Sequence, residues 1–278
     1  MVLQIPLFQS LININRGGVK LVSQTNKGAS AARNTGLRHA TGEYVQFLDA
    51  DDTLDPYKIE AQMKCFEGSK WNEGMLVFGK WSRSEDIEDV PASQKSIYHT
   101  YENPVDVLID IAILNTYIAI HAYLLPMSLI KKAGGWDEEL SRNDDGEFMA
   151  RVLKEARLLM YCDEGTAFYR NVSESLSKQA SNENMSSYLE SNIRICEIIS
   201  ASDHYLARHA VCQRMNKVLF TCYPYNMKYW NQGKDYLLSK YPDYMIRIIP
   251  LNWKEKTYFI LFQIAKFFCS LVGVKIYH

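Results

Sequence analysis

Residues 41–52 have the sequence TGEYVQFLDADD, in which a compact apolar run follows a Thr-Gly pair and ends in acids. Such a run is typical of a buried strand in a parallel sheet. Ligands of open parallel sheets bind beyond the carboxyl ends of the strands, so these acids stand where a ligand is expected. The stretch therefore predicts an α/β fold with a ligand site at the end of a strand over 44–48.

Three acids follow this strand, namely Asp49, Asp51 and Asp52. Two carboxylates that are two positions apart in an extended turn can point to the same side and share one hard divalent cation. That cation keeps open positions for the oxygens of a diphosphate. A solvated turn, in which Asp52 or Asp55 only caps the next helix, is the alternative interpretation, because acids are common in turns.

Helical and extended patterns alternate on both sides of this strand. Helices are predicted over 29–39, 104–114 and 147–156, from Asp55-Pro56 onward and from Ser128 to Gly134-Gly135, and strands over 75–79, 118–125 and 158–162, with a surface loop over 82–95. From about residue 184 onward, apolar residues recur at helical spacing. We therefore expect an α/β core over 1–180 and a helical C-terminal region over 181–278.

The composition is that of a globular protein without a dominant charge. The chain has 278 residues, with 31 Lys and Arg against 32 Asp and Glu. This balance argues against a nucleic-acid binder, which needs a basic surface, and against an acidic disordered tail. The six cysteines form no CxxC pair, which favours free thiols in a reducing cytosol. No secretory signal is recognisable at the start, so we expect a cytoplasmic protein.

The most apolar segment of the chain lies at 258–276. Lys266 stands near its centre, where a charge costs about 2.5–3.5 kcal/mol in a membrane span. Gln263, Lys266 and Ser270 share one helical face, opposite a wide apolar face. We predict a helix that lies in the membrane interface, which would make the protein peripheral at the inner face of the cell membrane. A helix that closes the core and a true span are the alternatives.

The segment that precedes the predicted strand over 44–48 adds a second part to this sequence pattern. Residues 26–36 are NKGASAARNTG, and residues 40–52 are ATGEYVQFLDADD. Together they resemble the family 2 glycosyltransferases of the GT-A fold, whose pattern N-x-G-x-x-x-A-R-N-x-G precedes a hydrophobic strand that ends in D-A-D-D. The resemblance implies a Rossmann-like core that binds a nucleotide-diphospho-sugar, with UDP as the commonest nucleotide.

The resemblance also implies roles for residues on the donor side. Asp51 would bind Mn2+ or Mg2+, and Asp49 would contact the nucleotide ribose or support the metal. Asn26, Gly28 and Arg33 would lie at the nucleotide. These roles agree with the chemistry, because a metal and an arginine both stabilise negative charge on a leaving nucleoside diphosphate. Without the motif, Arg33 would be interpreted as part of a surface salt bridge.

A second acidic segment lies downstream. Residues 132–140 are KAGGWDEEL and residues 143–148 are NDDGEF. They are similar to the family's k-x-G-G-[FW]-D-E-x-L followed by an E-D pair. The resemblance implies that Asp145 is the catalytic base, which takes a proton from the acceptor hydroxyl in an inverting displacement. In the alternative interpretation, Asp144 and Asp145 complement the dipole of a helix that runs through Arg151; both interpretations are compatible.

Three further features of the sequence are interpreted as follows. Tyr169-Arg170 with 175–177 resembles the family's Y-R-x(n)-S-x-S segment, which implies that Arg170 lies near the donor phosphates. A plain exposed loop is the alternative. His121 is expected to be a hydrogen-bonded core residue, and Trp136 a core residue or an acceptor platform.

The resemblance covers about residues 19–178, and the V-D-D-G-S-like front of the family pattern does not appear in it. Two hypotheses follow. The chain is an inverting glycosyltransferase that acts on a saccharide or lipid-linked acceptor, as in the biosynthesis of a bacterial surface polysaccharide. In the other hypothesis it is a truncated, non-catalytic or partner-dependent product that lacks competent donor binding, because a nucleotide fold without its first strands loses nucleotide contacts.

Overall fold

The structure is a computed structural model, which describes residues 20–67, 69, 74–83, 91–169, 182–223 and 226–244. The chain divides into two units, Met1–Leu237 and Leu238–His278. The architecture below belongs to the first unit. The predicted boundary at residue 180 stays a prediction, and the predicted interfacial helix over 258–276 lies outside the described residues.

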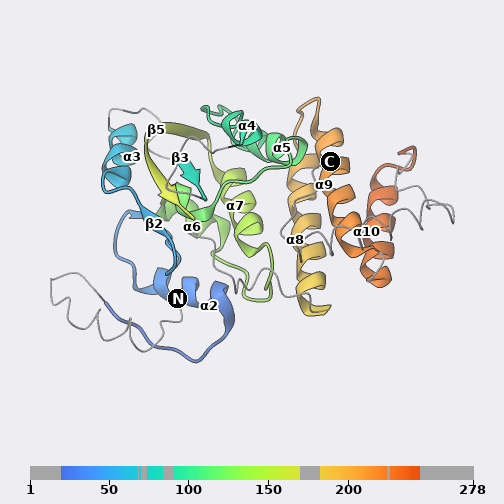
Figure 1. The fold of residues 1–278 in the computed structure, drawn as a ribbon, viewed down its shortest axis with the longest axis horizontal. Helices are drawn as coiled ribbons and strands as arrows, with labels where there is room; N and C mark the ends of the chain where they lie inside the picture. The colour runs from blue at the N-terminus through green and yellow to red at the C-terminus, as the bar shows by residue number, and fades with distance from the viewer. Residues whose placement is uncertain are drawn as a thin grey trace, which may run out of the picture. The chain divides into compact units, whose positions relative to one another are not determined.

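A mixed sheet forms the centre of the first unit (Figure 1), and the strands of the described residues join it in the order β1-β4-β3-β5-β2. Among these described strands, β3 and β5 are the one parallel pair, whereas β4 is antiparallel to β3 and β1, and β2 is antiparallel to β5. The strands are β1 Tyr44–Val45, β2 Thr53–Leu54, β3 Met75–Ser82, β4 Tyr123–Pro126 and β5 Leu158–Phe168.

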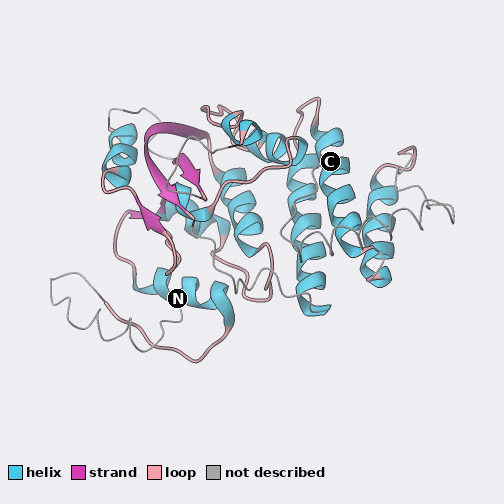
Figure 2. Cartoon of the chain, in the orientation of Figure 1, coloured by secondary structure: helices cyan, strands magenta, loops and turns pink. Residues whose placement is uncertain are grey.

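Helices make up most of the rest of the described chain (Figure 2). Their bounds are α2 Gly28–His39, α3 Lys58–Phe66, α4 Ala92–Lys95, α5 Asp106–Ile113, the 3-10 helix η2 Ile120–Ala122, α6 Met127–Ala133, α7 Asp144–Glu155, α8 Asn182–Ser200, α9 Ala207–Cys222 and α10 Met227–Lys240. Helix α8 packs against α7 and α9, and α9 packs against α5. Helices α8 and α9 are therefore joined to the α/β part through α5 and α7.

The register of β3 and β5 shifts near the middle of the pair. Gly79 pairs with Cys162, but the next residue, Lys80, pairs with Thr166. The additional residues of β5 include Gly165, which has a φ of +74° and faces Lys58 so closely that a Cβ at Gly165 would lie 2.5 Å from the Lys58 Cα. Glycine is therefore required at this position both by its backbone conformation and by the space available.

The strand that was expected over 44–48 differs from its prediction. It comprises only Tyr44–Val45, and it pairs antiparallel with β4, so the expectation of a parallel partner is wrong. An apolar run indicates burial but contains no information on the direction of the neighbouring strand. The burial itself is also less complete than expected, because only Phe47 of the run is buried, while Tyr44 and Val45 are half-buried and Leu48 is exposed. After Val45 the side-chain amide of Gln46 donates hydrogen bonds to the carbonyls of Phe47 and His121.

Other boundaries move by a few residues. The helix expected from Asp55-Pro56 begins at Lys58, and the Asp55 carboxylate instead accepts a hydrogen bond from the backbone N–H of Tyr57. The extended segment expected over 118–125 includes the turn of η2, and the strand expected over 158–162 continues to Phe168. The loop expected over 82–95 contains α4. The helices predicted over 29–39, 104–114 and 147–156 correspond to α2, α5 and α7.

Two further predictions concern the cysteines and a membrane-spanning helix. The cysteines in the described part are free, as expected; they are Cys65, Cys162, Cys196, Cys212 and Cys222. No helix among the described residues is both long and apolar enough to cross a membrane.

Candidate functional site

Arg33 on α2 joins the two acidic segments that the sequence separates. Its Nη2 lies 3.0 Å from Oδ1 of Asp49, and its Nη1 lies 2.9 Å from Oδ2 of Asp144, which is 111 residues away in the chain. Its guanidinium carbon lies 4.4 Å from the centroid of the Trp136 ring. Burial opposes the charged form of Arg33, but Asp49 and Asp144 outweigh it and raise the pKa. Arg33 is therefore a fixed cation between the two acidic segments.

The start of α2 lines a groove. Gly28 adopts a φ of +87°, and its N–H donates to Oδ1 of Asn26 at 3.0 Å. The groove has a volume of about 640 Å³, and it lies between α2 and the segment over 45–49. Four residues predicted to contact the nucleotide line it together: Asn26, Gly28, Arg33 and Asp49. The fifth, Arg170, lies outside the described residues.

The three acids after β1 point in different directions. Asp52 is buried, with 1% of its side chain exposed, and its Oδ2 lies 3.0 Å from Nδ1 of His121, which is equally buried. The backbone N–H of Asp52 donates to the carbonyl of Asp49 and closes the turn. Asp51 is exposed, and 42% of the Asp49 side chain is exposed. The turn therefore directs Asp52 into the core and leaves the other two carboxylates accessible.

Asp49 and Asp51 carry the kind of oxygen ligand that a magnesium-like or manganese-like cation prefers, although Arg33 already contacts both oxygens of Asp49. Such cations are commonly held by one or two carboxylates, with waters and substrate phosphates as the remaining ligands. Among the described residues no group of three or more His, Cys, Asp or Glu side chains is placed to hold a metal ion by itself. A cation at Asp49 and Asp51 would therefore depend on oxygens from a bound diphosphate.

Asp145 lies in the first turn of α7, directly after Asp144. Its Oδ1 accepts a hydrogen bond from the N–H of Gly146 at 2.8 Å. Burial, and then the charge of Asp144, raise the pKa of the Asp145 carboxyl to about 6, while Arg33 opposes this rise. A general base works best when its pKa lies near the working pH, so this environment suits Asp145 to accept a proton.

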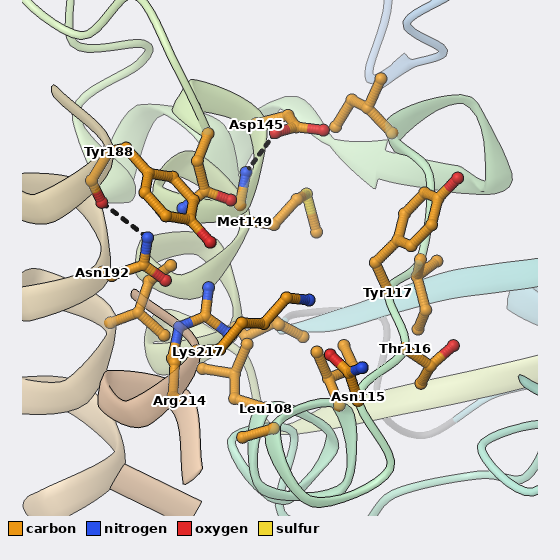
Figure 3. Close-up of a pocket in the computed structure, with 18 of the residues that line it drawn as sticks. Leu108, Asn115, Thr116, Tyr117, Asp145, Met149, Tyr188, Asn192, Arg214 and Lys217 are labelled. Carbon is orange, nitrogen blue, oxygen red and sulfur yellow. Dashed lines mark hydrogen bonds between the residues drawn. The ribbon is translucent and has the colours of Figure 1, made fainter. Parts of the chain in front are cut away.

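Asp145 also lines a second cavity, of about 290 Å³, which lies between α5, α7, α8 and α9 (Figure 3). The wall includes Tyr117 from the segment after α5 and Tyr188 from α8, and α9 adds Arg214 and Lys217. The sequence analysis did not identify these residues. A signal was present, because Arg214 falls at helical spacing among buried apolar residues of α9.

The loop after α6 is fixed by Asn34 on α2. The Asn34 side chain accepts a hydrogen bond from the N–H of Trp136 and donates to its carbonyl, both at 2.9 Å. The Trp136 ring stacks on Phe148 at 4.3 Å and meets Phe47 edge-on. With 3% of its surface exposed, Trp136 is a core residue that holds the loop in place under Arg33.

Part of the chain is similar to known glycosyltransferases. Residues 7–71 match the family model described as glycosyl transferase family 2. The chain is 53% identical over 45 residues to the uncharacterized glycosyltransferase YibD of Escherichia coli, a match that covers 16% of this chain and 13% of YibD. It is 26% identical over 164 residues to the uncharacterized glycosyltransferase EpsJ of Bacillus subtilis, covering 58% of this chain and 47% of EpsJ. These matches span less than half of either relative.

A solved structure with a similar fold is residues 1–349 of S. aureus TarS in complex with UDP-GlcNAc. The TM-score is 0.62 at 14% identity, and the match covers 84% of this chain and 68% of the TarS chain. At this identity the likeness establishes the fold alone. The predicted α/β, GT-A fold is confirmed.

Proposed function

Because residues 7–71 match glycosyl transferase family 2 and the chain has the GT-A fold, we propose that it is an inverting glycosyltransferase that uses a nucleotide-diphospho-sugar donor. The observation that carries the proposal is the position of Arg33, which bonds to Asp49 on the donor side and to Asp144 beside the proposed base. The residues proposed to bind the leaving diphosphate and the residue beside the proposed base thus both contact Arg33.

The donor occupies the groove along α2 in this proposal. Asn26, Gly28, Arg33 and Asp49 contact the nucleotide, together with Arg170, and Asp49 with Asp51 would hold Mn2+ or Mg2+. A bound divalent cation stabilises the negative charge that develops on the leaving diphosphate. UDP-GlcNAc is the donor to test first, because the TarS fragment with the same fold was solved with it.

Asp145 is the base of the proposed reaction. It accepts the proton of the acceptor hydroxyl while the hydroxyl oxygen attacks the anomeric carbon, and the nucleoside diphosphate leaves from the opposite side. Such an in-line displacement inverts the configuration at that carbon. Its backbone hydrogen bond and its place in the first turn of α7 hold the carboxylate in a fixed position.

The acceptor is proposed to be a saccharide or a lipid-linked saccharide, in the biosynthesis of a bacterial surface polysaccharide. A cytoplasmic location at the inner face of the cell membrane agrees with this acceptor. The apolar sequence over 258–276 supports a peripheral attachment to the membrane surface.

Calorimetric titration of UDP-GlcNAc, with and without Mn2+, tests the proposal. We expect metal-dependent binding that Asp51→Ala weakens, whereas Asp145→Asn abolishes transfer but leaves donor affinity nearly unchanged. Asp235→Asn is the matched control, because Asp235 is an exposed aspartate on α10. A folded protein that binds no UDP-sugar would support the alternative hypothesis, a non-catalytic or partner-dependent product.

A further inference from the structure

The cavity beside Asp145 contains two cations that no described carboxylate neutralises by direct contact. Arg214 and Lys217 extend into it from α9, and Asp145 lies at another side (Figure 3). Within the described part of the chain, neither residue has an ion pair, and the buried Nε of Arg214 has no hydrogen-bond partner. Arg214 as a whole is half-buried, but a polar nitrogen that is buried without a hydrogen-bond partner is costly, so this arrangement favours a bound anion.

The groups around Arg214 also favour the binding of an anion. Burial lowers the pKa of Arg214, and nearby Cys196, Tyr188 and Asp145 only partly oppose this change. Burial and the charge of Arg214 also lower the pKa of Lys217, which stands at the exposed side of the cavity. The remaining polar lining is neutral, with Asn115, Thr116, Tyr117, Asn143 and Asn192. The cavity therefore has a net positive charge, even when Asp145 is ionised.

We propose that this cavity binds an acceptor sugar that bears an oxyanion, either a carboxylate or a phosphate. Arg214 and Lys217 hold the oxyanion, and a hydroxyl of the same sugar faces Asp145. This inference rests on the proposed function, because it names the acceptor class of that site. The volume of about 290 Å³ lies at the lower end of the range for small-molecule sites, about 300–1,000 Å³, which suits one charged sugar unit.

NMR titrations of the full chain test the oxyanion site directly. Protein saturated with UDP and the diamagnetic Mg2+, or without them if neither binds, is titrated with inorganic phosphate and acetate, and then with glucose 6-phosphate, glucuronate and glucose. The Arg214 Nε–Hε resonance is followed in every protein that contains Arg214, and backbone amide resonances of α9 are followed in all variants. We expect phosphate or acetate to shift this resonance, and at least one charged sugar to bind at least about tenfold more tightly than glucose, given the strength of hydrogen bonds between charged groups.

Three variants separate the site from unspecific anion binding. Arg214→Met should weaken oxyanion binding at least about tenfold and Lys217→Gln by a smaller factor, because Lys217 is more exposed. Lys154→Gln, which removes an exposed cation from α7, should change it less than about twofold. Arg214→Met should also raise the thermal midpoint, because an apolar side chain replaces an uncompensated charge. If Arg214→Met fails to fold, Lys217→Gln still reports on the site.

The outcomes distinguish this inference from the proposed function. UDP-GlcNAc binding with no oxyanion response at Arg214, or with a response that both cavity variants retain, would overturn the inference and leave the enzyme intact. Oxyanion binding that depends on Arg214, without any binding of a nucleotide-sugar, would uphold the cavity and refute the donor assignment. Binding of phosphate that is unchanged in Arg214→Met and Lys217→Gln would show that the anion binds elsewhere, which also overturns the inference.

Discussion

Lys58 makes the free energy of unfolding of the protein increase as the pH rises into the alkaline range. Its side chain is fully buried, and its Nζ donates to Oε1 of Gln46 at 2.5 Å and to Oε1 of Gln62 at 2.7 Å. Burial lowers the pKa of Lys58 from 10.5 to about 7, a change that Cys162 only partly opposes. Both partners are neutral amides, so they accept hydrogen bonds but do not neutralise the ammonium charge.

The sign and the size of the effect follow from proton linkage. Between about pH 7 and 10.5 the unfolded lysine binds more protons than the folded one, so the free energy of unfolding rises with pH. One pKa unit corresponds to about 1.4 kcal/mol, so the full shift is worth at most about 5 kcal/mol. Raising the pH from about 7 to about 9 recovers about 2 kcal/mol of this penalty.

Urea unfolding of the wild type and Lys58→Met at about pH 7 and about pH 9 measures this contribution. The wild type should gain about 2 kcal/mol more than the variant over this interval. The difference in pH dependence is the decisive quantity, because Lys58→Met also leaves the oxygens of Gln46 and Gln62 without their donor. Lys64→Met, at an exposed position of the same helix, should follow the wild type. Equal pH dependence in the wild type and Lys58→Met would refute a depressed pKa at Lys58.

Two further predictions concern the site. Turnover should fall as the pH decreases through about 6, because Asp145 must be deprotonated to act as a base; a rate that stays constant between about pH 5 and pH 7 would contradict this role. Arg33→Met should lower the free energy of unfolding by about 1–3 kcal/mol in urea titrations, because Asp49 and Asp144 lose a shared charged partner. Arg38→Met, at an exposed position of the same helix, is the control, and equal losses in both variants would count against the bridge.

The two acidic segments show which features of the site can be predicted from the sequence and which cannot. The position of Asp49 after an apolar strand and of Asp145 at the start of a helix followed from local patterns, and both are observed there. The ion pairs of Arg33 with Asp49 and Asp144 did not follow, because they join residues that are far apart in the chain. Arg33 was instead assigned to the nucleotide from the motif, and that role stays a proposal.

The second cavity lies beyond what local patterns contain. Its cations belong to α9, which the sequence presents as one amphipathic helix among several. The helical spacing of α9 places Arg214 among buried apolar residues, but its position beside Asp145 follows only from the packing of α9 against α5 and α8. The antiparallel pairing of β1 was missed for a related reason, since strand direction is set by the chain between the strands rather than by the strand sequence.

The two sides of the proposed active site differ in charge, and this difference constrains what each can bind. On the donor side Arg33 is matched by Asp49 and Asp144, and Asp51 adds a further negative charge. A diphosphate is therefore repelled there unless a divalent cation accompanies it, which accounts physically for metal dependence in the proposed reaction. On the other side Arg214 and Lys217 exceed the charge of Asp145. An anionic acceptor is thus directed away from the donor groove and toward the base.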